Sequence, residues 1–177
     1  MSMELNLTNG QVAERKLLIT VAEWSTTTGT TTTQNREILG TRTEDSSIEF
    51  NADIQTTTDI RGITYTDINK TEPQQSFDPF YIMGGSKLAA YLTEAALTNN
   101  IDAYSNKFNI YVIAAFSGNS TNGYFAVKHS NCSIIPTSMG GDAKVAMPIE
   151  VHYSNDIARG TVDKLDDDFE FTAVVAG

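Results

Sequence analysis

Two histidines and one cysteine are the residues in this chain best suited to catalysis or metal binding. His129 and Cys132 are neighbours in the sequence His-Ser-Asn-Cys, and His152 follows later. A zinc site takes three or four ligands, and this sparse set does not predict one. It also lacks a nucleophile with a general base and a third group to orient that base. We therefore expect no metal site, no catalytic residues, no cofactor and no enzyme activity.

Two other motifs resemble ligand-binding loops but lack essential positions. The aspartate run 166–168 has neither the alternating carboxylates nor the distal glutamate of a calcium loop. The sequence Gly84-Gly85-Ser86-Lys87 lacks the first glycine of a phosphate-binding loop. The first motif predicts a solvated loop, and the second predicts the start of a helix.

The overall charge limits the partners that the chain can hold. Its formal net charge is −10 over 177 residues. A grip on nucleic-acid phosphate needs Lys and Arg to displace counterions, so this composition argues against nucleic-acid binding. It still allows a protein past which nucleic acid moves without being held. The sequence has no apolar run long enough to span a membrane and no signal-peptide pattern at its start, so we expect synthesis in the cytoplasm and no membrane partner.

Hydrophobic periodicity predicts one mainly β domain over residues 1–177. Strands are expected over residues 16–24, 36–43, 108–116, 124–129, 134–136, 145–153, 159–162 and 169–175. The helical stripe of Leu88, Tyr91, Leu92 and Ala95 follows Ser86, a suitable N-cap, and ends near Asn99. Eight or nine strands with this single helix predict an α+β fold, a small β-sandwich or barrel.

Two segments fall outside this periodic pattern. Residues 1–15 show no clear period and are expected to be an N-terminal arm that a neighbour must hold in place. Residues 25–34, with the sequence STTTGTTTTQ, have no apolar side chain to bury. This Thr-rich loop is expected to be either mobile or a docking surface.

The sequence between residues 44 and 81 predicts a long β-hairpin followed by a proline-marked crossover. In its first arm, Ile48, Phe50, Ala52 and Ile54 alternate with Glu49, Asn51, Asp53 and Gln55, which predicts one apolar and one acidic-polar face. A second arm is expected over residues 63–69. The predicted core contains residues from this apolar face, the helix and the central strand: Ile48, Phe50, Ile54, Leu88, Leu92, Phe108, Ile110 and Val112. Such a hairpin has free edges that invite association unless something closes them.

Residues 37–51, 57–92, 138–153 and 159–162 together resemble the tail tube (major tail) proteins of long-tailed bacteriophages that infect Gram-positive bacteria. The most specific part is DIRGITYTDINKTEPQQSFDPF followed by the Gly-Gly that precedes the helix. The Thr-rich stretch and both termini lie outside the resemblance. The family's fold is a small β-sandwich with one flanking helix, which assembles into hexameric rings with a continuous inner β-barrel.

The resemblance implies a structural virion protein located in the tail. Stacked rings would form the tail tube, with a tape measure protein inside and distal tail or terminator proteins at the ends. Double-stranded DNA would pass through the channel into the host without specific binding. Acidic side chains repel phosphate at short range, which favours sliding over sticking.

An assembly of stacked rings gives two sets of residues an expected place, the first from the resemblance and the second from the composition of the Thr-rich loop. The acidic-polar face would line the channel and consists of Glu49, Asn51, Asp53, Gln55 and Thr57. The threonines of the loop would either make ring-to-ring contacts or belong to a mobile segment without contacts: Thr26, Thr27, Thr28, Thr30, Thr31, Thr32 and Thr33.

Two alternatives remain open from the sequence. A tail terminator or head-to-tail joining ring needs the same closing sheet as a tube. A β-sandwich carbohydrate-binding module of a tail tip belongs to a different class and would need exposed aromatic residues on a strand face.

Overall fold

The computed structural model of the chain describes residues 3–43 and 45–174. This part of the chain contains eleven strands and one α-helix. The elements are β1 (Leu18–Thr28), β2 (Thr31–Ile38), β3 (Ile48–Glu49), β4 (Ala52–Thr58), β5 (Thr64–Thr71), β6 (Gln74–Phe77), α1 (Lys87–Leu97), β7 (Phe108–Asn119), β8 (Gly123–Pro136), β9 (Ile149–His152), β10 (Ile157–Val162) and β11 (Phe171–Ala173). The mainly β composition with one helix agrees with a β-sandwich-like domain.

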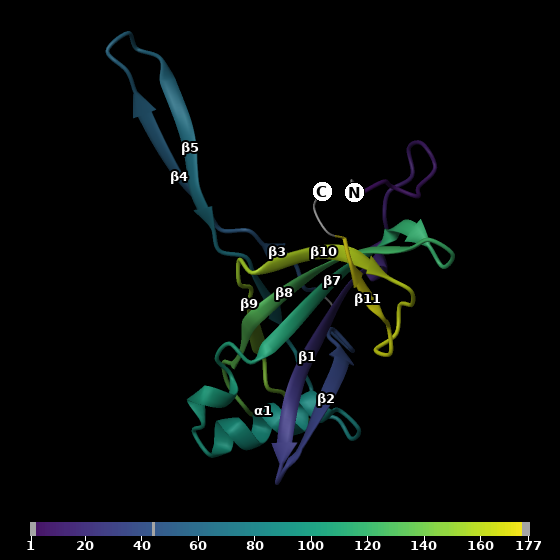
Figure 1. The fold of residues 1–177 in the computed structure, drawn as a ribbon. Helices are drawn as coiled ribbons and strands as arrows, with labels where there is room; N and C mark the ends of the chain where they lie inside the picture. Colours follow the sequence, from purple (N-terminus) through teal and green to yellow (C-terminus); the bar gives the residue numbers. More distant parts are fainter. Residues whose placement is uncertain (1–2, 44, 175–177) are drawn as a thin grey trace.

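Nine of the described strands form one antiparallel sheet, and β4 and β5 form a separate pair (Figure 1). The main path runs β2-β1-β7-β8-β9-β6-β3. The first half of β8 also pairs with β10, which in turn pairs with β11. Its second half pairs with β9. β8 therefore belongs to both halves of the sheet and joins them.

The central strand β7 is buried on both faces, as expected for the continuous apolar run FNIYVIAAF at residues 108–116. Phe108 and Ile110 enter the larger core cluster, which also contains Trp24 of β1. Tyr111 and Ile113 point to the other face, into a smaller cluster that Phe169 helps to cover. Because side chains alternate along a strand, only a strand lined with apolar residues on both faces can serve two clusters.

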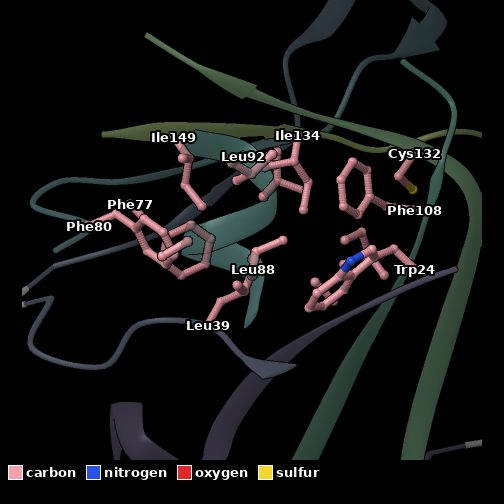
Figure 2. Packing of buried hydrophobic residues seen from close by; sticks show 14 of the residues in the cluster. Trp24, Leu39, Phe77, Phe80, Leu88, Leu92, Phe108, Cys132, Ile134 and Ile149 are labelled. Carbon is pink, nitrogen blue, oxygen red and sulfur yellow. The ribbon is translucent and has the colours of Figure 1, made fainter. Parts of the chain in front are cut away.

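The helix α1 forms where the sequence predicted it. The Ser86 Oγ accepts a hydrogen bond from the Ala89 N–H at 3.0 Å and so caps the helix. The Glu37 carboxylate of β2 strengthens this end, since it accepts bonds from the Ser86 hydroxyl at 2.6 Å and the Leu88 N–H at 3.0 Å. Leu88 and Leu92 then lie in the larger core cluster (Figure 2).

The residues 25–34 are not a loop. They form the outer part of the β1–β2 hairpin, in which Thr26 pairs with Thr33 and Thr28 with Thr31. Gly29 takes the positive φ of 63° at the turn. Threonine favours extended backbone, and the buried inner part of β1 fixes the register, so the stretch pairs without burying its own side chains.

The prediction that Phe50 and Ile54 of the hairpin belong to the core is wrong. Phe50 and Ile54 are 66% and 58% exposed. Phe50 and Asn51 interrupt the strand between β3 and β4, and Asn51 has a positive φ of 42°. The break turns the hairpin away from the sheet, so its apolar side chains lose contact with the core. The other predicted core residues are buried, or in the case of Ile48 and Val112 partly buried against the larger cluster.

Several strand boundaries also differ from the prediction. The crossover contains an additional strand, β6, and the run predicted over 145–153 narrows to β9. Pro148 has no N–H to donate, and the regular ladder begins at the next residue, Ile149. The final strand is confirmed only for 171–173, and residue 175 of that prediction lies outside the described residues. Residues 3–14 contain neither helix nor strand, while residues 1 and 2 of the predicted N-terminal arm are outside the description.

The contrast between Phe108 and Phe50 gives a direct stability test. Phe108→Ala should lower the free energy of unfolding by about 3–5 kcal/mol, because it leaves a cavity in the larger cluster. Phe50→Ala should change the stability of the single chain by about 0.5 kcal/mol or less, because that ring is largely exposed. Urea unfolding of dilute protein measures both values. A large loss for Phe50→Ala would mean that the hairpin packs on the domain.

Candidate functional site

The pair β4–β5 with its turn, residues 52–71, is a two-stranded arm that projects from the domain (Figure 1). Every residue of both strands is exposed. A two-stranded ribbon on its own is marginally stable in water. An arm of this length without packing on the rest of the chain therefore suggests a surface that another molecule covers.

Local hydrogen bonds fix both ends of the arm. At its foot, the Glu72 N–H donates to the Phe50 carbonyl at 3.2 Å, and the Asn51 side-chain amide donates to the Glu72 carbonyl at 3.1 Å. At its tip, the Asp59 Oδ1 accepts the N–H groups of Arg61 and Ile63 at 2.8 and 2.9 Å. The arm therefore has a defined turn at its tip and does not end in an open loop.

The two faces of the arm differ in chemistry. The strand register places four uncharged pairs on one face, here called the uncharged face: Ala52–Thr71, Ile54–Ile68, Thr56–Thr66 and Thr58–Thr64. The opposite face, here called the charged face, has the pairs Asp53–Lys70, Gln55–Asp67 and Thr57–Tyr65. Directly opposed residues share a face, so this division follows from the ladder itself.

The uncharged face and the tip expose large aliphatic side chains. Ile54 and Ile68 lie directly opposite each other, and both are exposed. Ile60 at the tip is 105% exposed and Ile63 beside it is also exposed. The pairs Thr56–Thr66 and Thr58–Thr64 separate these two groups of exposed aliphatic side chains. Together they make the uncharged face and the tip a candidate interaction surface.

The charged face is not purely acidic, because the second strand adds a lysine opposite the acidic-polar residues predicted for the first strand. Lys70 lies opposite Asp53 and contacts the Glu72 carboxylate at 2.6 Å. The hydrogen bond from Lys70 to Glu72 raises the pKa of the lysine above its ordinary value. The Asn69 amide donates to the Asp53 Oδ2 at 3.3 Å. Partial neutralisation lowers the charge density that the sequence suggested for this strand.

The structure divides the five residues proposed to line a channel. Asp53, Gln55 and Thr57 share the charged face of the arm. Glu49 belongs to β3, where it pairs with Gln74, and Asn51 lies in the break between β3 and β4. The five therefore do not form one continuous strand face, and whether they line a channel stays a prediction.

An apolar cleft of about 410 Å³ lies at the foot of the arm. Its lining residues come from segments far apart in the sequence and include Leu18, Ile48, Phe50, Val112, Val127 and Tyr153. We call this cavity the foot cleft. The Arg15 side chain also borders it, with its Nε and Nη1 donating to the carbonyls of Ser46 and Leu18 at 3.1 and 2.6 Å. The sequence could not reveal the cleft, because its walls meet only through tertiary folding.

The predicted ring-stacking threonines lie together on the outer β1–β2 hairpin. Thr26 to Thr28 belong to β1, and Thr31 to Thr33 belong to β2. The hydroxyls of Thr27 and Thr32 are 3.2 Å apart across the strands. This hairpin has an ordered polar surface, and its contact with another ring stays a prediction.

A partly buried ion pair, which the sequence did not predict, links the strands β1 and β2. The Arg36 Nε donates to the Glu23 Oε2 at 2.6 Å, and the Asn109 amide donates to Oε1 at 2.8 Å. Arg36 also lies over the Phe169 ring, 4.5 Å from its centroid. Burial raises the pKa of the Glu23 carboxyl, but the bonds from Asn109 and Arg36 and the Arg36 charge outweigh it, so the pKa lies below its ordinary value. The apolar run of β1 held a signal, because Glu23 stands between the apolar residues Ala22 and Trp24, and an acid at such a position needs a partner.

The lowered pKa predicts a dependence of stability on pH. A depressed pKa contributes stability above the unfolded-state value of about 4.3, and that contribution disappears as pH falls through the folded-state pKa. Glu23→Gln should therefore lower the free energy of unfolding by about 1–3 kcal/mol at pH 7 and by less near pH 3. Unfolding at both pH values measures the difference.

The matched control is Glu14→Gln, whose carboxylate contacts Lys16 at 2.6 Å in an exposed pair. Exposed pairs contribute little, so this change should have a small effect at both pH values. Equal losses for the two variants at pH 7 would contradict a stabilising role of the Glu23–Arg36 pair.

The histidines and the cysteine make structural bonds. Cys132 is buried, its thiol donates to the His129 carbonyl at 3.4 Å, and the Ser154 N–H contacts its sulfur at 3.5 Å. Burial raises the pKa of the Cys132 thiol, which disfavours the thiolate.

Across residues 3–43 and 45–174, no cluster of three or more His, Cys, Asp or Glu is arranged to hold a metal ion. In the same part of the chain, no helix has the length and apolar character needed to cross a membrane.

Comparison with known proteins gives little further guidance. No protein-family model and no curated protein sequence matches the chain. Among solved structures, a chain from the cryo-EM structure of the anti-feeding prophage baseplate, 6-fold symmetrised, is similar at 14% identity and a TM-score of 0.46. The match covers 90% of this chain and 100% of the other. These values are too low to support a conclusion about function.

Proposed function

We propose that this protein is a self-assembling structural subunit of a bacteriophage tail, and that its arm binds a neighbouring copy. The exposed arm is the observation on which the proposal depends. Its uncharged face and tip present Ile54, Ile60, Ile63 and Ile68 to solvent. Removing such side chains from water contributes about 1.5–3 kcal/mol each when burial is complete. A second molecule that covers them gains this free energy on association.

The strand edges support assembly of more than two copies. In the described part of the sheet, β2 pairs only with β1, β11 only with β10, and β3 only with β6. Each has a free edge with unpaired backbone groups, and pairing between copies removes such edges. Interfaces between unlike surfaces of identical chains produce rings or open filaments, according to whether the rotation closes.

The finer assignment is the tail tube. The sequence resemblance to major tail proteins includes residues 57–71 of the arm, and that family's hexameric rings stack into tubes around a DNA channel. In this assignment the tape measure protein occupies the channel, and terminator and distal tail proteins bind the ends. The net charge of −10 suits a channel that DNA crosses without binding.

The alternatives from the sequence are weighed by specific side chains. A carbohydrate-binding surface uses exposed aromatic rings, but the single tryptophan, Trp24, is buried in the larger cluster. Tyr65 is the aromatic residue that the arm exposes, on the charged face beside Thr57. This pattern favours an assembly protein over a sugar-binding module. A terminator ring would use the same arm and edges, and the length of the assembled particle distinguishes it from a tube.

The first test compares two acidic substitutions on opposite faces of the arm. Ile54→Asp with Ile68→Asp places two carboxylates on the uncharged face, while Gln55→Asp with Thr57→Asp places two on the charged face. Wild-type protein and the charged-face variant should form rings and tubes at rising concentration, and the uncharged-face variant should stay monomeric. Light scattering and negative-stain microscopy measure this, with circular dichroism as the check on folding.

Failure of the wild type to form any oligomer would overturn the proposed function. Equal assembly of both variants would show that the uncharged face makes no contact. Particles of a single ring that never lengthen would favour the terminator alternative.

The second test concerns the channel. Glu49→Lys with Asp53→Lys should leave assembly intact, because both side chains are exposed, but the tubes should then bind DNA with an affinity that falls as salt rises. The control is Glu94→Lys with Asp102→Lys, the same change in charge on exposed residues near α1. DNA binding by assembled tubes at several salt concentrations measures the effect. Equal binding by the two variants would place Glu49 and Asp53 outside the channel.

A further inference from the structure

We infer that the foot cleft of one copy receives the tip of another copy's arm, with Ile60 as the side chain that enters it. This inference rests on the proposed function, since it names the surface that the arm contacts. The arm projects away from the domain that holds its own foot cleft, so tip and cleft of one chain do not meet (Figure 1). The occupant is therefore a second copy.

The chemistry of the cleft matches the chemistry of the tip. The cleft walls include the aliphatic side chains Leu18, Ile48 and Val127, together with the Phe50 ring. The tip presents the aliphatic Ile60, which no other side chain covers, and Ile63 next to it. An aliphatic side chain that fills a preformed apolar cavity is the usual anchor of a protein interface.

The charges at the two surfaces are complementary. Arg15 borders the cleft, and among the described residues no carboxylate lies within ion-pair distance of its guanidinium. Asp59 precedes Ile60 at the tip, and its carboxylate accepts backbone N–H groups but contacts no cation in the same set of residues. An aspartate that arrives with Ile60 would lie beside an arginine that has no acidic partner within residues 3–43 and 45–174, which favours this orientation of docking.

The position of Phe50 fits the same arrangement. This ring is exposed in the single chain although its sequence pattern is that of a core residue. It lines the cleft directly below the arm. Docking of a neighbour's tip would bury it, so Phe50 would belong to a core that two copies complete together.

The contact joins two different surfaces, the tip of one copy and the foot cleft of the next, and the length of the arm sets the spacing between successive copies. The seven residues of β4 rise about 23 Å at 3.3 Å per residue, so the tip lies roughly that far from its own foot. Each copy offers one tip and one cleft, and successive contacts therefore propagate in one direction. This geometry suits the stacking of layers more than a closed pair.

Cysteine crosslinking tests the contact between copies. Ile60→Cys protein is mixed with Ser47→Cys protein, because Ser47 is an exposed residue that lines the foot cleft. Under assembly conditions and mild oxidation, a disulfide between residues 60 and 47 of different copies should form at least about tenfold faster than in the control. The control pairs Ile60→Cys with Thr121→Cys, an exposed residue in the β7–β8 turn that does not line the cleft. Ile60→Cys alone controls for the native, buried Cys132.

A second measurement uses the tip side chain. Ile60→Asp should raise the concentration needed for assembly by at least about tenfold, and Ile60→Val should restore most of the loss. The outcomes separate the two proposals. Assembly of the cysteine variants without a 60–47 disulfide above the control, or an Ile60→Asp protein that assembles like wild type, overturns this inference and leaves the proposed function standing. Wild-type protein that never assembles overturns both.

Discussion

The burial of β7 on both faces is the constraint on which the rest of the domain depends. One set of its side chains enters the larger core cluster with Trp24 and the helix, and the other set enters the smaller cluster under Phe169. The strands β1 and β8 pair with β7, so both of their faces must also be covered by side chains where they lie beside it. The ion pair of Glu23 and Arg36 belongs to the same constraint, because it lets a charged residue occupy the covered face of β1.

The arm does not take part in the packing around β7, so its side chains are free to contact another molecule. The domain is stabilised by its two clusters, whereas the arm contributes no side chain to either of them. Changes on the arm are thus separated from the stability of the fold. A surface of this kind can specialise for contact, with one uncharged and one charged face produced by the simple alternation of a strand.

The break between β3 and β4 both starts the projecting arm and forms one edge of the foot cleft. Asn51 adopts a left-handed backbone conformation that asparagine tolerates better than most residues. At this residue the chain leaves the sheet and begins the arm, whereas the preceding residue, Phe50, lines the edge of the cleft. The same turn therefore creates the projecting tip and the cavity that we propose receives it.

The sequence by itself determined the mainly β class, the double-sided burial of β7, the capped helix from Ser86, and the existence of a long hairpin, because each of these follows from local periodicity and local hydrogen bonds. It did not determine where the hairpin points. The alternation of Ile48, Phe50 and Ile54 is the same whether a domain or a partner covers the apolar residues, and only the break at Asn51 decides between them. Likewise, the Thr-rich segment lacks apolar residues but pairs because the buried part of β1 sets its register. The foot cleft and the Glu23–Arg36 pair join residues distant in sequence, so only the tertiary structure brings them together.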